Sequence, residues 1–193
     1  AFFADVEGDT SAWSTAGSTG VSTWAASTAR PYAGTKSWLA IDHAAPSDQR
    51  LVSPPIALPA GQSPLTLSFR SQVNLEPRDA THCWDSGVLD ISTNGGTTWT
   101  AVSPAQLLYD TYTGLQSGGP ASGQSAWCGS RPYRKTVVDL ASYAGQTINL
   151  RFRVTTDTSV GNEPHGWYVD DIRVQSCTDD DGIFADGFEA TTP

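Results

Sequence analysis

Strict alternation of apolar and polar residues is the feature that most limits what this chain can fold into. From Ile148 to Val154, in the stretch TINLRFRVT, every second side chain is apolar and the side chains between them are polar. A period of two places the apolar side chains on one face of a β-strand. We therefore expect a half-buried strand whose polar residues, Arg151 and Arg153 among them, point to solvent.

The same alternation recurs along most of the chain. Strands are expected near residues 2–7, 21–26, 37–41, 50–57, 65–73, 87–92, 97–102, 133–139, 147–155 and 166–174. Asn94-Gly95-Gly96 is typical of a short hairpin turn. Few windows collect good helix formers, whereas 18 Gly and 12 Pro suit many turns. The sequence therefore predicts an all-β fold, a two-sheet antiparallel jelly-roll sandwich.

Charge divides the chain into a domain and a tail. The formal net charge is −9, and residues 178–193 carry five acids and no bases. We expect a domain over residues 1–177 followed by an acidic C-terminal tail. Such a surface repels nucleic acid. No apolar run reaches the roughly 20 residues of a membrane span. Because the chain starts at Ala1, lacks Met and shows no signal peptide, we expect a processed or excised fragment. We expect the isolated domain to be a monomer.

Three cysteines allow at most one disulfide within the chain. Cys83 and Cys128 both lie in Gly-rich loop sequence, and we expect them to pair. The alternative is three reduced thiols. Neither the cysteines nor the histidines have the spacing of a zinc site, and HExxH and GxSxG motifs are absent.

The stretch of residues 103–132 has no sustained period. A loop of this length is usually functional or held in place by other groups. Trp84 and Trp127 each adjoin a cysteine of the expected disulfide, and Tyr112 lies within the stretch. Exposed rings at these three positions would bind a sugar or a protein partner. The alternative is that the rings close the edges of the sandwich.

Several segments, in this order, resemble a known family: ADVEGDTSAW, DQRLVSPPIAL, NLEPRDATHCWDSGVLDISTNGGTTW, VVDLASYAGQTINLRFRVTTD and GWYVDDIRV. They are similar to the MAM-like jelly-roll domain appended to bacterial secreted proteases of the immune-inhibitor-A and fungalysin types. The chain departs from that pattern in its cysteines and in WDSG, where WDGG is common. The ending IFADGFE resembles the C-termini of exported proteins of the Xanthomonas–Lysobacter group. The resemblance implies a secreted bacterial accessory domain.

Asp170 is the first candidate metal ligand. By alternation it shares a face with Ile172 and Val174 and points to the core, where an unpaired carboxylate is costly. The first and last strands of a jelly roll are commonly neighbours, which would bring Glu7 close, and calcium would bridge the two acids. The resemblance also implies a structural calcium here. Further expected ligands are Asp9, Asp42 and Asp171, and the alternative partners of Asp170 are backbone N–H groups or an arginine.

A second group of acids comprises Glu76, Asp85 and Asp157. Glu76 and Asp85 flank one loop, Asp157 follows the strand of residues 147–155, and the resembled family carries acids at these three places. The group predicts a second Ca²⁺ site that pins loops at one edge of the sandwich. The alternative is three solvated loop acids.

Three functions follow from these residues. The leading hypothesis is a non-catalytic, calcium-binding accessory domain of a secreted hydrolase, which we expect to be a protease. The domain would dock on a protein or glycan surface or stabilise the enzyme. The second is a carbohydrate-binding module. The third is a jelly-roll enzyme acting on glycans, which would require paired acids across a cleft.

Overall fold

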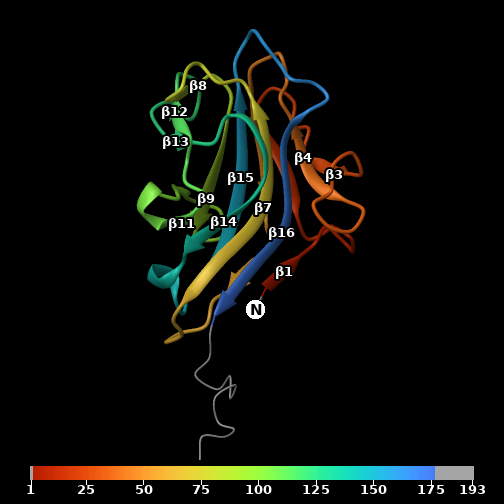
Figure 1. Cartoon of the computed structure of the whole chain (residues 1–193). Coiled ribbons are helices and arrows are strands. Elements are labelled where there is room, and N and C mark those ends of the chain that lie inside the picture. The colour runs from red at the N-terminus through yellow and green to blue at the C-terminus, as the bar shows by residue number, and fades with distance from the viewer. Residues whose placement is uncertain (1, 177–193) are drawn as a thin grey trace, which may run out of the picture.

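Two antiparallel sheets pack face to face in the computed structural model, which describes residues 2–176 (Figure 1). The larger sheet has the order β11 (Leu107–Tyr109), β14 (Gly129–Asp139), β7 (Leu65–Leu75), β16 (Gly166–Ser176), β4 (Ser37–Ile41) and β3 (Ala25–Ser27), and β1 (Phe2–Ala4) also pairs with β16. The smaller sheet has the order β10 (Thr100–Ala101), β9 (Ser86–Ser92), β15 (Thr147–Thr156), β5 (Ser47–Val52) and β2 (Ser14–Thr19), and β6 (Ile56–Ala57) also pairs with β15. The predicted all-β, two-sheet fold is confirmed.

A third, small sheet and two 3-10 turns complete the described chain. The sheet joins β13 (Ser125–Ala126), β12 (Gly114–Gln116) and β8 (His82–Cys83), with β12 parallel to β8. The turns are Pro104–Gln106 and Ala141–Tyr143. The aperiodic stretch of residues 103–132 therefore supplies β11, β12 and β13, three strands too short to show a period. Among residues 2–176 no helix is long and apolar enough to cross a membrane.

The core lies between the two large sheets and is rich in aromatic rings. The inward side chains of β15 from Ile148 to Val154 are fully buried, as the alternation predicts. Phe152 meets Phe69 edge-on at 5.2 Å between ring centroids and Trp167 at 5.8 Å. Rings in such tilted contacts add attraction to their burial of apolar area, and they join the two sheets.

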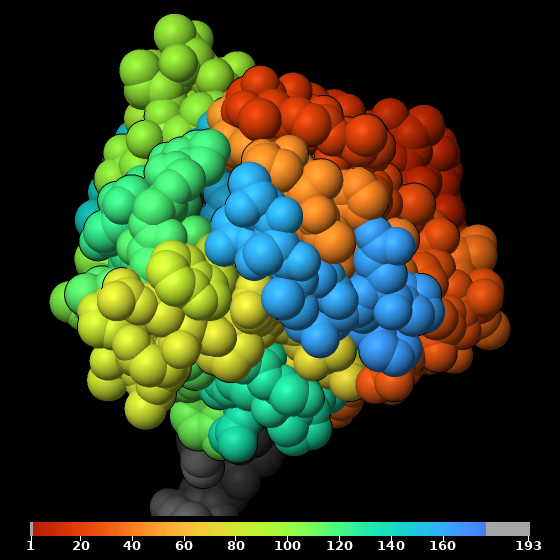
Figure 2. Space-filling view, turned by 90° about the horizontal axis from the view of Figure 1, so that it is seen from above, coloured from red at the N-terminus to blue at the C-terminus, as the bar shows by residue number. Residues whose placement is uncertain are grey.

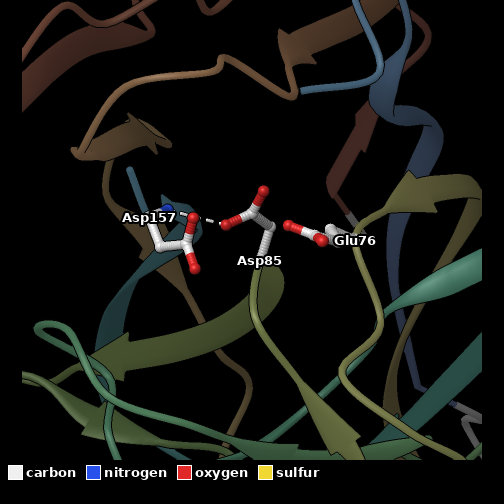
Figure 3. Close-up of side chains that lie close together, drawn as sticks. All are labelled: Glu76, Asp85 and Asp157. Carbon is white, nitrogen blue, oxygen red and sulfur yellow. Dashed lines mark hydrogen bonds between the residues drawn. The ribbon is translucent and has the colours of Figure 1, made fainter. Parts of the chain in front are cut away.

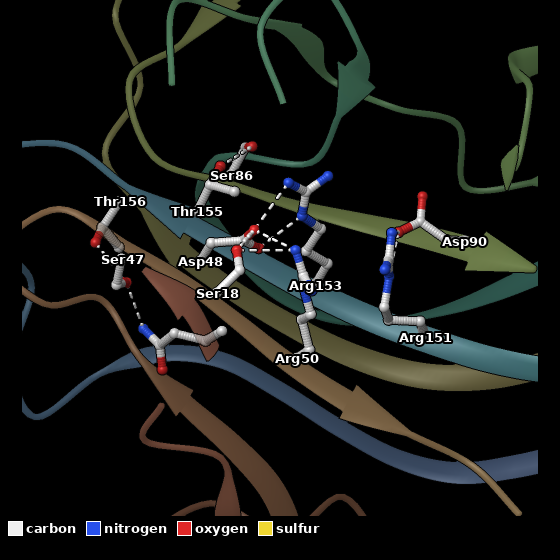
Figure 4. A network of polar contacts seen from close by, with 11 residues as sticks. Ser18, Ser47, Asp48, Arg50, Ser86, Asp90, Arg151, Arg153, Thr155 and Thr156 are labelled. Atoms are coloured by element: carbon white, nitrogen blue, oxygen red, sulfur yellow. Dashed lines mark hydrogen bonds and ion pairs between the residues drawn. The ribbon is translucent and has the colours of Figure 1, made fainter. Parts of the chain in front are cut away.

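Arg151 and Arg153 were predicted to reach solvent, but they do not. They lie on the outer face of the smaller sheet, yet they are only 8% and 6% exposed. Arg151 binds Asp90 at 2.7 Å and stacks under Trp99, and Arg153 binds Asp48 at 2.7 Å (Figure 4). Ion pairs and a covering ring bury these guanidinium groups, which alternation alone cannot foresee.

One turn and one strand also differ from expectation. Residues 93–99 separate β9 from β10, so the Asn94-Gly95-Gly96 turn belongs to a longer loop, held by the Ser92 hydroxyl and the Asn94 side chain. The strand β2 was not predicted because its sequence STAGST is exposed throughout and has no apolar face. It is placed by pairing with β5.

The predicted disulfide between Cys83 and Cys128 is present. It ties β8 to the residue that precedes β14, and it closes a segment with a sequence separation of 45. Cys177 and the acidic tail of residues 178–193 lie outside the described residues.

Replacing both Cys83 and Cys128 by alanine should destabilise the protein. Loss of a cross-link that spans 45 residues frees the unfolded chain and should lower the free energy of unfolding by about 4 kcal/mol. Urea unfolding of the double variant beside the oxidised wild type measures this difference. Equal midpoints under non-reducing conditions would contradict the pairing.

Asp48 should control stability at acid pH. Its burial raises the pKa of the carboxyl, but hydrogen bonds from Arg153, Ser18 and Arg50 outweigh burial and lower the pKa to about 2. Because the folded pKa lies below the ordinary value, the ionised group stabilises the fold above about pH 4, and this contribution is lost as the pH falls towards 2.

Asp48→Asn should therefore lower the free energy of unfolding at neutral pH by about 3 kcal/mol, since Arg153 would be left buried without a counterion. The variant should also lose less further stability than wild type between about pH 4 and pH 2. Thermal unfolding across this range tests both effects, and parallel pH profiles for the two proteins would refute the assignment.

Candidate metal centre

Four acidic residues meet at one end of the sandwich, each beside the end of a strand. Asp42 directly follows β4, Glu76 follows β7, Asp157 follows β15, and Asp85 directly precedes β9. β4 and β7 flank β16 in the larger sheet, whereas β9 and β15 are neighbours in the smaller one. The four carboxylates therefore come from both sheets, and we call them the acidic cluster.

Close contact between loops makes this arrangement possible. Figure 2 looks down on this end and shows the loop of residues 157–165 (blue) between the segment that follows β4 (orange) and the region around β8 (yellow). A Cβ atom at Gly166 would lie 2.0 Å from the Ala40 carbonyl oxygen, and one at Gly161 would lie 2.6 Å from that of Asp42. Glycine at both positions lets the loop lie directly on the chain around Asp42.

The side chains of Glu76, Asp85 and Asp157 converge (Figure 3). One carboxylate oxygen of each lies within 4.8 Å of the others. The Asp157 N–H donates to Asp85 Oδ1 at 2.7 Å, and the Asp85 N–H donates to the Glu76 carbonyl at 3.0 Å. These backbone bonds fix the three acids relative to one another.

Asp42 completes the acidic cluster. Its carboxylate lies against that of Asp85, and its Oδ2 accepts a hydrogen bond of 2.6 Å from the side-chain amide of Asn162. The Asp42 N–H donates to the His165 carbonyl at 2.8 Å. The loop of residues 157–165 thus holds both the backbone and the side chain of Asp42.

Three oxygens of the acidic cluster have no partner. Asp42 and Asp85 are fully buried, and Asp42 Oδ1, Asp85 Oδ2 and Glu76 Oε2 receive no hydrogen bond. A buried acceptor left without a donor costs about 1–3 kcal/mol, and more when it is charged. Three such oxygens in one cluster favour a bound positive group.

Other buried acids of the described chain are satisfied. Asp48 and Asp90 pair with arginines, and Asp170 accepts three backbone N–H bonds. By contrast, no ion pair among residues 2–176 involves a member of the acidic cluster. The shortage of positive charge is therefore local to this end of the sandwich.

Electrostatics point the same way. Burial and the facing Asp42 raise the pKa of Asp85, and burial raises the pKa of Asp42. Burial and the negative charges of Asp157 and Asp42 also raise the pKa of Glu76. Carboxylates about 4.8 Å apart repel one another by about 3 kcal/mol per pair at an effective dielectric constant of about 20. A bound cation would reverse the sign of these interactions.

The donor set fits calcium. Ca²⁺ takes six to eight oxygen ligands at about 2.3–2.6 Å, so its ligand oxygens lie up to about 5 Å apart. The oxygens of Glu76, Asp85 and Asp157, which lie within 4.8 Å of one another, fall within this limit. No cysteine or histidine contributes a ligand atom to this group, so it offers oxygen alone, which suits a hard cation rather than zinc.

The structure corrects the predicted orientation of Asp170. A β-bulge shifts the register of β16 between Asp170 and Arg173, so Val169 and Ile172 both belong to the core, and Asp170 faces outward. It is nevertheless fully buried, because the loop of residues 32–36 covers it and donates N–H bonds from Tyr32 and Ala33. Of the partners expected for Asp170, backbone N–H groups are the ones that the structure shows.

Glu7 binds the same loop as Asp170. Its carboxylate accepts N–H bonds from Thr35 and Lys36, at 2.9 and 2.7 Å, and a hydroxyl bond from Thr35. The two acids thus hold adjacent parts of one loop, as expected of neighbouring first and last strands. A calcium between them stays a prediction.

The remaining ligands expected around Asp170 lie elsewhere. Asp42 was predicted to join Asp170 but contacts Asp85, because β16 places the end of β4 near the end of β7. Asp9 is exposed and accepts bonds from Ser11 in its own turn. Asp171 lies in the bulge with φ of 50° and faces the solvent side of the larger sheet.

One of the three predicted binding rings, Trp127, is not at the surface. It is 1% exposed and packs against Phe69 and Trp167, so for this ring the alternative of closing the sandwich is correct. Tyr112 is half-buried against Trp127, and its hydroxyl donates to the Val102 carbonyl. It also lines an open groove, and its binding role stays a prediction.

Trp84 is the most exposed ring of the three. It is 36% exposed and lies 5.1 Å from the guanidinium of Arg78. Sequence reasoning missed a more exposed ring, Tyr109, which is 60% exposed beside Leu108. Tyr109 and Leu108 line an open groove of about 450 Å³ together with Arg131 and Arg134. We call it the Tyr109 groove.

Asn162 is the other residue that sequence reasoning missed. A signal for the cluster was nevertheless present, since Asp42, Glu76 and Asp157 each directly follow a strand that the alternation had identified near its position. Acids at the ends of neighbouring strands gather at one edge. The order of strands in the sheet, which the alternation does not give, decides which of them are neighbours.

No family model matches the sequence. Over 132 residues, or 68% of its length, the chain is 29% identical to bacillopeptidase F of Bacillus subtilis (strain 168), and it spans 7% of the length of that protein. The similarity thus connects the chain with one part of a much larger protein. Together with the fold, it fits a protease-associated jelly roll, and the MAM-like assignment stays a prediction.

Solved structures share the fold at low sequence identity. The K1 cleaved adhesin domain of Lys-gingipain from Porphyromonas gingivalis W83 superposes with a TM-score of 0.58 at 17% identity, over 92% of this chain and 98% of that domain. TmCBM61, solved in complex with β-1,4-galactotriose, gives 0.54 at 12% identity, over 89% of this chain and 93% of that one. Likeness at these identities establishes the β-sandwich fold and no more.

Proposed function

We propose that this chain is a calcium-stabilised, non-catalytic accessory domain of an extracellular, protease-associated protein. The observation that carries the proposal is the acidic cluster, in which three buried carboxylate oxygens lack any partner. Similarity to part of bacillopeptidase F and the fold of an adhesin domain support the protease-associated, extracellular setting. Partners would be a protein or glycan surface.

Calcium would act as a clamp between the sheets. Asp42 and Glu76 extend from strands of the larger sheet, and Asp85 and Asp157 from strands of the smaller one. An ion bound by all four would replace their repulsion with attraction and hold the loop of residues 157–165 in place. Because the ligands come together only in the folded chain, binding would stabilise the native state.

Removal of calcium should lower the melting temperature. At a calcium concentration about 1,000 times Kd, binding adds about 4 kcal/mol, which corresponds to about 10 °C for a chain of this size. Thermal unfolding in EDTA, and again after calcium is restored, measures the shift. An unchanged melting temperature, with no metal found by elemental analysis, would overturn the calcium assignment.

Asp85→Asn should have opposite effects with and without calcium. In EDTA above about pH 9, where the Asp85 carboxyl ionises, the variant should be more stable than wild type because one buried negative charge is gone. In calcium it should be less stable because a ligand is lost. Asp170→Asn is the comparison, since Asp170 is equally buried but has N–H partners. A calcium response lost in Asp170→Asn and kept in Asp85→Asn would move the ion to the Glu7–Asp170 site.

Carbohydrate binding is the second candidate function. Tyr109 presents an exposed ring at an open groove beside Arg131 and Arg134, an arrangement suited to stacking on a sugar ring with polar groups at its rim. The fold shared with TmCBM61, which was solved with a bound galactotriose, supports this candidate.

Tyr109→Ala should weaken binding of a neutral oligosaccharide about threefold to tenfold if the groove holds sugar. Titration calorimetry with β-1,4-galactotriose is the measurement. Phe3→Ala, which removes an exposed ring outside the groove, is the control. Equal affinity of both variants and wild type, or no binding at millimolar sugar, would exclude the groove as the site.

A further inference from the structure

Positive charges gather in a hollow on the solvent face of the larger sheet. Arg70 of β7, Lys135 of β14 and Arg173 of β16 line an open hollow of about 260 Å³, with Tyr32 at its edge. β7 lies between β14 and β16, so three neighbouring strands each contribute one cation. We call this the basic hollow. It stands out on a chain with a net charge of −9.

The three cations have no counterion in the described chain. Among residues 2–176, none of their side-chain nitrogens forms an ion pair or a hydrogen bond with a protein group. Arg50, Arg131 and Arg153 each bind an aspartate. These partly or fully buried arginines are thus paired, whereas those of the hollow, like the exposed Arg134, are not.

Two aromatic rings hold the arginines in place. The guanidinium carbon of Arg70 lies 4.5 Å from the centre of the Tyr32 ring, and that of Arg173 lies 4.2 Å from the centre of the Phe3 ring. Tyr32 is itself anchored, because its N–H donates to Asp170. The stacking limits the freedom of both guanidinium groups while their N–H donors stay accessible at the ring edges.

This arrangement has a cost that packing does not offset. Lys135 and Arg70 are direct cross-strand partners, and like charges in this position destabilise a sheet. Asp170 lies opposite Arg70 on β16, but its oxygens accept backbone N–H bonds and it forms no ion pair with Arg70. Arg173 adds a third positive charge opposite Ser68, the next outward position of β7. Side chains on the solvent face are not needed to fill the core, so a ligand that neutralises them would explain their gathering.

The nearest acids narrow the choice of ligand. Asp171 lines the hollow, placed outward by the bulge of β16, and Asp170 lies buried under the loop with its oxygens bonded to N–H groups. An ionised carboxylate accepts hydrogen bonds and donates none. Asp171 would repel a ligand with closely spaced phosphates or sulfates, but it would accept bonds from hydroxyl groups.

We propose that the basic hollow binds a uronic acid residue of an acidic polysaccharide. The sugar carboxylate would bind the cations of Arg70, Lys135 and Arg173, and its hydroxyls would donate to Asp171. Ser68 and Gln175 supply further neutral hydrogen-bonding groups at the wall. The proposal rests on the binding role of the domain and not on calcium, and its site differs from the Tyr109 groove.

A matched pair of oligosaccharides tests the ligand. Trigalacturonate and galactotriose both carry hydroxyl groups, but only the first carries a carboxylate on each ring. Titration calorimetry at low salt and constant calcium should show the uronate binding at least about tenfold more tightly, and the advantage should shrink as salt is added. Equal affinity for the two sugars would overturn the proposal.

Variants locate the site. The double variant Lys135→Ala/Arg173→Ala removes two exposed side chains and should weaken trigalacturonate binding more than tenfold. Arg78→Ala is the control, because it removes an exposed cation that lines neither the hollow nor the Tyr109 groove. An equal loss in both variants would mean that net charge, and not the hollow, governs binding.

A variant of Asp171 tests whether the hollow prefers a uronate to a simple polyanion. Asp171→Asn suits the positive φ at this position, and it should strengthen binding of tripolyphosphate because a repelling charge is gone. Wild type should bind trigalacturonate more tightly than tripolyphosphate. The reverse order would show a general anion site and overturn the uronate assignment, whereas the calcium and Tyr109 tests would be unaffected.

Discussion

Every buried charge in this sandwich needs an opposite charge or a set of hydrogen-bond donors, and the structure meets that need in different ways. Asp48 and Asp90 take arginines on the outer face of the smaller sheet, and Asp170 takes backbone N–H groups from a loop. In the acidic cluster three buried oxygens have neither kind of partner among the protein groups described. The contrast within one chain is a stronger argument for a cation than the presence of acids, because exposed acidic groups are common.

The two unbalanced regions have opposite sign and follow from different parts of the fold. The acidic cluster arises where strand ends of both sheets meet, so it is tied to how the sheets are joined. The basic hollow arises on the face of one sheet, where outward positions of β14, β7 and β16 are free of packing constraints. We therefore assign the first to stability and the second to recognition.

The alternation of apolar and polar residues predicted the core, but it could not predict which face a side chain takes on either side of a β-bulge. From Ile148 to Val154 the alternation is unbroken, and the inward face was identified correctly. In β16 a single bulge moves Val169 and Ile172 to the same face and turns Asp170 outward, and nothing local in the sequence GWYVDDIRV marks its place. The acids Glu76, Asp85 and Asp157 were grouped through a family resemblance, whereas Asp42 was misplaced because its neighbours depend on strand order.

Solved structures that share this fold show which positions of the sandwich are free to vary. The adhesin domain and the galactotriose-bound module share the sandwich at 17% and 12% identity, so the inward pattern that builds the sandwich tolerates extensive change. Strand-end loops and outward positions are free of this requirement. In this chain those positions carry one group of uncompensated carboxylates and one group of uncompensated cations, stacked on Tyr32 and Phe3. Since neither group is required for the core, each is best explained by what it would bind.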